Sequence, residues 1–144
     1  MPMDEPGQSE REAQLVRELL KRYPNPLDED EVKELLKGRL ESEGWQVKVK
    51  RGRTHGIDVE ATKGTARWII EAKGFSAKVS PVEYFKDVLG EILQRMESDG
   101  PKYSIAFPDI KDFRNLWERL PGLAKRRAGI SCLFVDKEGR VVES

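Results

Sequence analysis

The sequence predicts an α/β domain in which a mixed central sheet is flanked by helices. Three segments with strand patterns follow one another between residues 45 and 72, which is the arrangement of a meander. Later in the chain, helix and strand patterns alternate, which indicates strands added in parallel. The expected order is therefore helix, three strands, helix, strand, helix and strand. With 144 residues, the chain is long enough for one domain with its own core.

We assign this domain to residues 27–144 and predict a separate helical arm in residues 1–26. Apolar residues recur at helical spacing over residues 8–23, and Pro24-Asn25-Pro26 then ends the helix. The apolar positions are Leu15, Val16, Leu19, Leu20 and Tyr23. We expect this arm to pack on the core or on a second subunit.

The first helix of the domain is predicted to begin at Asp28 and to end at Gly44. Asp28 and Glu31 have the spacing of a capping box, in which each side chain accepts a hydrogen bond from the backbone of the other residue. The apolar stripe of this helix consists of Val32, Leu35, Leu36 and Leu40. This stripe is expected to cover one face of the sheet.

Three strands are predicted after this helix. Apolar and polar residues alternate over residues 45–50 and again over residues 57–62, as in half-buried strands. Residues 66–72 contain a nearly continuous apolar run, which is typical of a central strand covered on both faces. Gly64 lies between the second and third segments and indicates a turn that makes them antiparallel neighbours.

The next helix has a clear start at Ser80-Pro81-Val82-Glu83, which combines a capping serine with a proline at the first helical position. It is expected to end before Gly100-Pro101 and to bury one face on the sheet. The residues of that face are Phe85, Val88, Leu89, Ile92, Leu93 and Met96. A further strand is predicted at residues 104–107.

Asp109 is expected to cap the last predicted helix, which ends at Pro121-Gly122. Its apolar residues are Phe113, Leu116, Trp117 and Leu120. Residues 130–135 form the next strand, and a turn at Lys137-Glu138-Gly139 precedes Val141-Val142. Cys132, the only cysteine, lies in this apolar strand, so we interpret it as a core residue without a disulfide partner.

The chain has no net charge, but its charges are unevenly distributed. Residues 44–79 hold 8 basic and 3 acidic residues, whereas residues 1–43 hold 7 basic and 12 acidic residues. A basic middle segment can bind a polyanion, and lysines that protect a sheet edge would give the same pattern. The sequence has no apolar run of 18 residues and no signal-peptide core, so we expect a soluble, cytoplasmic protein without a membrane partner.

Two acids and a lysine lie on the second and third predicted strands. Glu71 and Lys73 are two positions apart, so they point to the same face of their strand. Counting outward from Gly64 places Asp58 opposite residues 68–71. These charges would meet beside the most apolar run in the chain, where they are costly unless paired or bound to a metal. A salt bridge at the sheet rim and a metal site are both consistent with this spacing.

Two segments carry a motif: His55-Gly56-Ile57-Asp58 and, after a hairpin, Ile69-Ile70-Glu71-Ala72-Lys73-Gly74. Together they resemble the D…ExK signature of the PD-(D/E)xK nuclease superfamily, which includes restriction endonucleases, Mrr-like restriction enzymes and Holliday junction resolvases. The resemblance covers roughly residues 28–136 and implies a restriction endonuclease-like fold. Ile57 departs from the proline in the family name, at a position that is often hydrophobic.

The resemblance implies a metal-dependent endonuclease that hydrolyses phosphodiester bonds in DNA. Asp58 and Glu71 would ligate Mg²⁺, with Mn²⁺ as a substitute, and the backbone carbonyl of Ala72 would be a further ligand. Lys73 would orient the attacking water or stabilise the transition state, with its pKa lowered by the neighbouring dication. The alternatives are a catalytically silent nucleic-acid-binding or scaffold protein on the same fold, and an RNA-directed nuclease.

The superfamily also indicates two further candidate catalytic residues. Glu34 matches an acid that many members carry on the first core helix, although its position opposite the apolar stripe favours a solvated side chain. Gln94 matches a glutamine that members often carry on the helix after the ExK strand, with an exposed helix residue as the alternative.

Basic residues around the motif are candidates for contacts with duplex or branched DNA. These candidate nucleic-acid-binding residues are Lys48, Lys50, Arg51, Arg53 and His55. A second basic run, Lys125-Arg126-Arg127, can also be a solvated turn. Because cutting both strands of a duplex would require two active sites, we expect a homodimer.

Overall fold

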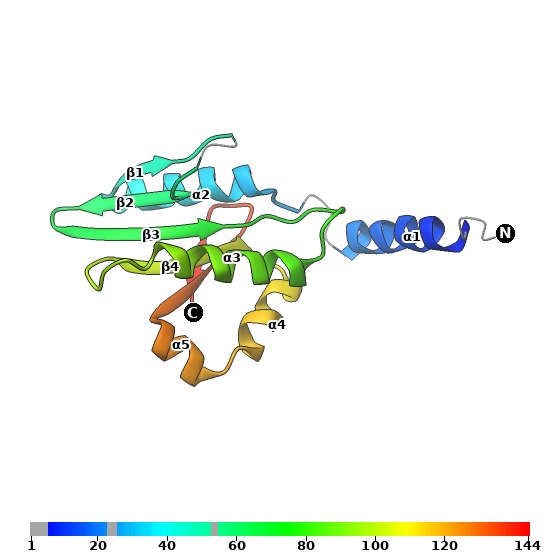
Figure 1. The fold of residues 1–144 in the computed structure, drawn as a ribbon. Helices are drawn as coiled ribbons and strands as arrows, with labels where there is room; N and C mark the ends of the chain where they lie inside the picture. The colour runs from blue at the N-terminus through cyan, green and yellow to red at the C-terminus, as the bar shows by residue number, and fades with distance from the viewer. Residues whose placement is uncertain (1–5, 23–25, 53–54) are drawn as a thin grey trace.

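The computed structural model of the chain describes residues 6–22, 26–52 and 55–144, arranged as in Figure 1. Over these residues, one six-stranded mixed sheet is flanked by helices, which is the predicted architecture. The strands are β1 Gln46–Val49, β2 Val59–Lys63, β3 Ala66–Ala72, β4 Lys102–Pro108, β5 Ile130–Val135 and β6 Val141–Glu143. The helices are α1 Pro6–Arg22, α2 Glu29–Ser42, α3 Pro81–Arg95, α4 Lys111–Arg119 and α5 Gly122–Ala128.

The strands lie in the sheet in chain order, from β1 to β6. β1, β2 and β3 form the predicted antiparallel meander, and β4 and β5 are added in parallel, also as predicted. Val59 of β2 pairs with Ile70 of β3, so Asp58, which immediately precedes β2, comes opposite Glu71. This register agrees with the one counted from Gly64, although β2 begins two residues later than the predicted strand.

Each face of the sheet carries its own hydrophobic cluster, and Figure 1 shows α2 and α3 on opposite sides. α2 packs with Ile70 and Ala72 of β3 on one face, whereas α3 and α4 pack with Ile69 on the other. Since side chains alternate along a strand, Glu71 and Lys73 follow Ile69 onto the face covered by α3. The two-sided burial predicted for this strand is therefore confirmed.

Two of the predicted helix starts are present in the structure. The backbone N–H of Glu31 donates to Asp28 Oδ1 at 2.8 Å, and that of Asp28 donates to Glu31 Oε1 at 3.2 Å, which completes the capping box. The Ser80 side chain accepts a hydrogen bond from the N–H of Glu83 at 3.3 Å, next to Pro81 at the first helical turn.

The structure corrects the predicted course of α3. The helix ends at Arg95 rather than near Gly100, and Leu93, which was assigned to the buried face, is 53% exposed. Phe85, Val88 and Ile92 are buried as predicted. The buried stripe is therefore narrower than the apolar sequence pattern, and polar residues occupy its border.

The start of α4 also differs from the prediction. Ile110 occupies the cap position and provides no side-chain hydrogen bond, so Asp109 is not the cap. The N–H of Asp109 donates to the carbonyl of Val135 at 2.7 Å, and the Asp109 carboxylate pairs with Arg114. Asp109 thus ties the end of β4 to β5 and to α4, which leaves it unable to cap the helix.

Three further boundaries differ from the sequence prediction. Pro121-Gly122 does not lead directly into a strand but begins the short helix α5, which contains the basic run at residues 125–127. β4 begins at Lys102 rather than residue 104, and Val141–Glu143 pairs antiparallel with β5 as a sixth strand. Cys132 is fully buried in β5, as expected for a core residue.

α1 agrees with the helix predicted for residues 8–23, except that Tyr23 lies outside the described residues, as do Pro24 and Asn25. Figure 1 shows α1 apart from the sheet, beyond the start of α2. Leu15 on this helix is 57% exposed. Of the helices in the described ranges, none combines the length and apolar character needed to cross a membrane.

A close approach of two backbones connects β3 to α2. Just beyond β3, the N–H of Phe75 donates to the carbonyl of Leu27 at 2.8 Å. A Cβ added at Gly74 would lie 2.1 Å from the backbone of Asp28 and Glu29. Only glycine fits this contact, which brings the first turn of α2 next to the end of the ExK strand.

Gly74→Ala is therefore expected to lower the free energy of unfolding by at least about 1–3 kcal/mol, because backbone atoms cannot yield to the added methyl group as a flexible side chain would. Urea denaturation followed by circular dichroism would measure the change. Gly90→Ala in α3 is the matched control, since a Cβ there meets no atom within 4 Å and alanine favours a helix. Equal stability of Gly74→Ala and the wild type would contradict the close approach.

Candidate active site

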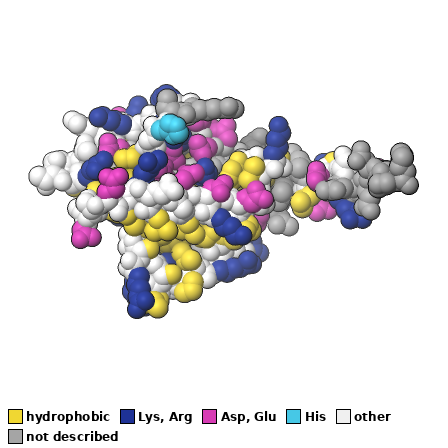
Figure 2. All heavy atoms as spheres, viewed as in Figure 1, with side chains coloured by type: hydrophobic (Ala, Val, Ile, Leu, Met, Phe, Trp, Pro, Cys, Tyr) yellow, Lys and Arg dark blue, Asp and Glu magenta, His cyan; other side chains and the backbone are white. Residues whose placement is uncertain are grey.

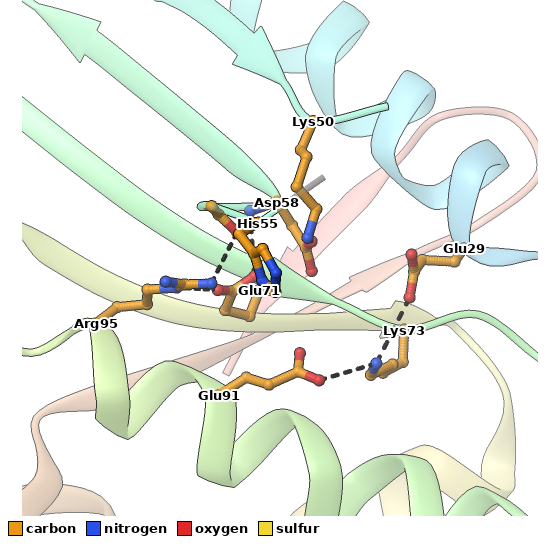
Figure 3. A pocket seen from close by; sticks show the side chains of 9 residues that line it. Glu29, Lys50, His55, Asp58, Glu71, Lys73, Glu91 and Arg95 are labelled. Carbon is orange, nitrogen blue, oxygen red and sulfur yellow. Dashed lines mark hydrogen bonds and ion pairs between the residues drawn. The ribbon is translucent and has the colours of Figure 1, made fainter. Parts of the chain in front are cut away.

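A pocket of about 290 Å³ opens beside the ends of β2 and β3, between the first turn of α2 and the last turns of α3. Figure 3 shows its charged side chains converging from these elements, and Figure 2 shows His55 at the surface among acidic and basic side chains. The lining residues are Glu29, Lys50, His55, Gly56, Asp58, Glu71, Lys73, Glu91 and Arg95. The structure thus brings the three D…ExK residues into one pocket.

Asp58 and Glu71 are held by reciprocal contacts between neighbouring strands. The N–H of Asp58 donates to Glu71 Oε2 at 3.1 Å, and the N–H of Ala72 donates to Asp58 Oδ2 at 3.0 Å. Asp58 is 4% exposed and Glu71 1% exposed. The positions of both carboxylates are therefore fixed by the β2–β3 register, and the backbone of Ala72 lies against Asp58.

Arg95 of α3 supplies a cation to Glu71. Its Nε donates to Glu71 Oε1 at 2.5 Å, and its terminal NH2 group donates to the carbonyl of Gly56 at 2.7 Å. One guanidinium therefore connects α3, β3 and the segment before Asp58, and it leaves neither oxygen of Glu71 without a donor.

Two lysines approach Asp58 from different sides. Lys50, which follows β1 and is 23% exposed, places Nζ 3.2 Å from Asp58 Oδ1. Lys33 of α2 is 2% exposed and lies 3.8 Å from the same oxygen and 3.1 Å from Glu29. Lys33 Nζ also donates to the carbonyl of Lys50 at 3.3 Å. Lys33 therefore approaches Asp58 from the interior of the protein, whereas Lys50 approaches it from the pocket.

Lys73 lies between two acids from different helices, as Figure 3 shows. Its Nζ is 3.1 Å from Glu91 of α3 and 3.7 Å from Glu29 of α2. Burial lowers the pKa of Lys73, but the hydrogen bond and charge of Glu91, with the charges of Glu29 and Asp58, raise it above its ordinary value. These contacts keep Lys73 a cation.

The same environment separates the pKa values of the two buried acids. Burial raises the pKa of Asp58, but hydrogen bonds from Glu71 and Ala72 and the charges of the two lysines outweigh burial and lower it. Burial and the hydrogen bond with Asp58 raise the pKa of Glu71 to about 7, although Arg95 opposes the rise. Asp58 is thus the more readily ionised acid of the pair.

The donor set fits a hard divalent cation. Asp58, Glu71 and Glu91 each offer a carboxylate oxygen, and these atoms lie within 4.8 Å of one another. Mg²⁺ prefers oxygen ligands and is commonly bound through a few carboxylates while it keeps several waters. The carboxylate of Glu91 joins the two motif acids here, and the Ala72 carbonyl remains a predicted ligand.

Of the other predicted site residues that the structure describes, Glu34, Gln94 and Lys48 lie outside this cluster. Glu34 is exposed and pairs with Arg51 at 2.6 Å, which agrees with its solvated alternative. Gln94 is exposed on α3 and does not line the pocket. Lys48 is exposed on β1, whereas Arg53 lies outside the described residues.

Sequence reasoning missed Glu29, Lys33, Glu91 and Arg95, although helical spacing contained a signal for each. Lys33 continues the stripe of Leu36 and Leu40, with Glu29 four residues before it. Likewise, Glu91 and Arg95 follow Val88 at three and seven residues, which places them on the border of the buried face of α3. Treating charged residues as solvated concealed this pattern.

No protein-family model and no curated protein matches the chain, but solved structures resemble it. One is an XisH family protein from Nostoc punctiforme PCC 73102, and another is an fdxN element excision controlling factor protein from Anabaena variabilis. Each is 17% identical with a TM-score of 0.57, and each match covers 77% of this chain and 95% of the other. At this identity the likeness shows the fold alone, which is α/β and restriction endonuclease-like.

The raised pKa of Glu71 predicts a pH-dependent stability of the metal-free protein. Folding favours the protonated acid, so this contribution is fully present below the ordinary pKa of 4.5 and is lost as the pH rises through about 7. In EDTA, the free energy of unfolding should therefore fall across this range, as measured by urea denaturation at several pH values.

Glu71→Gln is expected to flatten that dependence, because glutamine keeps the shape of the side chain but does not titrate. Asp58 affects stability in a different pH range. Because its pKa is lowered, its contribution to the free energy of unfolding is present above the ordinary pKa of 3.8 and is lost as the pH falls below that value. Identical pH profiles of the wild type and Glu71→Gln between pH 4.5 and 7 would contradict the assignment.

Proposed function

We propose that this protein is a metal-dependent endonuclease that hydrolyses phosphodiester bonds in DNA. The observation that carries the proposal is the cluster of three carboxylates, from Asp58, Glu71 and Glu91, in one pocket with Lys73. Two of these acids and the lysine form the D…ExK motif, and the third comes from the neighbouring helix. Buried acids that converge in a polar pocket are a common arrangement for catalysis.

The residues of the pocket have separable roles in this reaction. Asp58, Glu71 and Glu91 would hold Mg²⁺ or Mn²⁺, which lowers the pKa of a water molecule and offsets negative charge on the phosphate. Lys73, a cation between Glu91 and Glu29, is available to hold a water or a phosphate oxygen at the pocket. Arg95 acts as a positioning residue, because it fixes Glu71.

Residues around the pocket would contact the nucleic-acid backbone. His55 and Lys50 line the pocket, and Lys48 and Arg51 are exposed on the adjoining β1 segment. Such contacts position a duplex without reading its sequence. One of the two similar structures is named for control of excision of the fdxN element, a name compatible with a role in nucleic-acid chemistry.

The ion pairs also support a second candidate, a nucleic-acid-binding or scaffold protein that does not cut. Asp58, Glu71 and Glu91 each have a basic partner, so these ion pairs could also serve only to stabilise the fold. The contacts of a catalytic site and of a structural salt-bridge network would be the same. Metal binding and cleavage separate the two candidates.

Cleavage is expected to require both the metal and the motif residues. We expect nicking or cutting of labelled supercoiled, linear, branched or single-stranded DNA with Mg²⁺ or Mn²⁺, and none in EDTA. Asp58→Asn, Glu71→Ala and Lys73→Met should each reduce the rate by at least about 100-fold, the scale of losing one transition-state contact. Gel electrophoresis of timed samples would measure the rates, with an RNA substrate in parallel.

Glu41→Gln is the matched control, because Glu41 is an exposed acid of α2 that pairs with Lys37 away from the pocket. Its rate should equal that of the wild type. If no substrate is cut and calorimetry detects no metal binding, the structural network is the correct reading of the site. Metal binding without cleavage would favour the silent nucleic-acid-binding protein.

We further propose that the protein acts as a homodimer with α1 as a contact. Leu15→Glu would place a charge on an apolar side chain that is 57% exposed, so it should shift the protein toward the monomer. Light scattering after size-exclusion chromatography would measure the mass. A wild-type monomer, or a dimer that tolerates Leu15→Glu, would exclude this contact.

A further inference from the structure

The two lysines on Asp58 differ in their freedom to move. Lys33 is almost fully buried, and its Nζ contacts Glu29, Asp58 and the carbonyl of Lys50. The backbone of Lys50 is fixed by this contact and by the hydrogen bond from its N–H to the carbonyl of Asp58 at 2.8 Å. Its side chain, in contrast, lines the open pocket and is 23% exposed, and Figure 3 shows it pointing toward Asp58, whose Oδ1 lies 3.2 Å from Nζ.

When all of its acids are ionised, the site has as many negative as positive side chains before a metal binds. The four acids are Glu29, Asp58, Glu71 and Glu91, and the four bases are Lys33, Lys50, Lys73 and Arg95. A divalent cation held by the three clustered carboxylates would add two positive charges to a neutral and partly buried cluster. Because uncompensated charge is costly in such a place, an anion is needed to balance it or a base must leave.

Lys50 is the base best placed to leave. Lys33 is almost fully buried and has three partners, Arg95 makes two hydrogen bonds across the pocket wall, and Lys73 is shared between two acids. Lys50 contributes a side-chain ion pair at the pocket, and its fixed backbone keeps the ammonium group within reach of the opening.

We propose that Lys50 is an exchangeable counter-ion, which occupies Asp58 in the metal-free protein and transfers to a nucleic-acid phosphate when a divalent cation takes its place. Lys50 thereby competes with the metal for Asp58, but it favours the binding of nucleic acid once the metal is bound. Binding of the metal and of nucleic acid is then mutually strengthened, and by linkage each raises the affinity of the other by the same factor. This inference rests on the proposed metal site and adds a residue that couples it to substrate.

The coupling predicts effects of opposite sign in one variant. Lys50→Gln should bind Mn²⁺ about 5-fold more tightly than the wild type by calorimetry, because a competing cation is removed. In fluorescence anisotropy with a labelled 20-base-pair duplex, Ca²⁺ should raise the affinity of the wild type by about 5-fold or more and that of Lys50→Gln much less. In EDTA, the two proteins should bind the duplex almost equally, since Lys50 is then held by Asp58.

Two further lysine variants test the specificity of this result. Lys37→Gln removes the same charge from α2 outside the pocket, so its Mn²⁺ affinity should equal that of the wild type. Lys48→Gln removes an exposed charge from β1, so any loss of duplex affinity should be the same with Ca²⁺ and in EDTA. Denaturation in EDTA would verify that each variant is folded.

The outcomes separate this inference from the proposed function. If the wild type binds no Mn²⁺, the metal site itself fails, and the inference fails with it. If the wild type binds Mn²⁺ and cuts DNA, but Lys50→Gln binds Mn²⁺ with equal or lower affinity, the nuclease stands and the exchange is overturned. Tighter Mn²⁺ binding together with a lost Ca²⁺ effect on the duplex would establish the exchange.

Discussion

The site depends on the β2–β3 register, which places Asp58 opposite Glu71. In this register each carboxylate accepts a hydrogen bond from a backbone N–H of the other strand, from Ala72 for Asp58 and from Asp58 for Glu71. A slip of β2 by one residue would turn Asp58 to the other face of the sheet, where α2 packs, and would separate it from Glu71. The apolar alternation of β2 and β3 therefore fixes the positions of the charges, because burying Val59, Ile69 and Ile70 leaves the acids only one arrangement.

Burial of these acids has a cost that the surrounding helices offset. Lys33 and Glu29 come from the first turns of α2, and Glu91 and Arg95 come from the last turns of α3, so side chains from helices on opposite faces meet where β2 begins and β3 ends. The contact at Gly74 brings α2 to this edge. A loss of that contact would affect the charged cluster as well as the packing, since Lys73 lies immediately before Gly74.

The sequence predicted most of the fold but only the centre of the site. Strand alternation and capping pairs are local patterns, so the meander, the parallel strands and the starts of α2 and α3 could be read directly. Asp109 shows where a local rule fails, because a tertiary pairing with Arg114 outweighs the cap. The residues that the helices contribute to the pocket could not be predicted without knowing which helix faces lie against the ends of β2 and β3. The resemblance pointed to Gln94, but the next residue, Arg95, is the one that contacts Glu71.

The charge pattern acquires a more specific meaning from the structure. The basic residues of segment 44–79 do not form a uniform basic surface, because Lys50 and Lys73 are paired with acids, and Arg51 pairs with Glu34. A polyanion would therefore meet few unpaired charges on the metal-free pocket, and attraction to it must come from rearranging existing pairs. In such a site, the affinity for nucleic acid depends on which of the acids already bind a metal ion. The ion pairs of the pocket would therefore also determine whether the metal or the nucleic acid binds first.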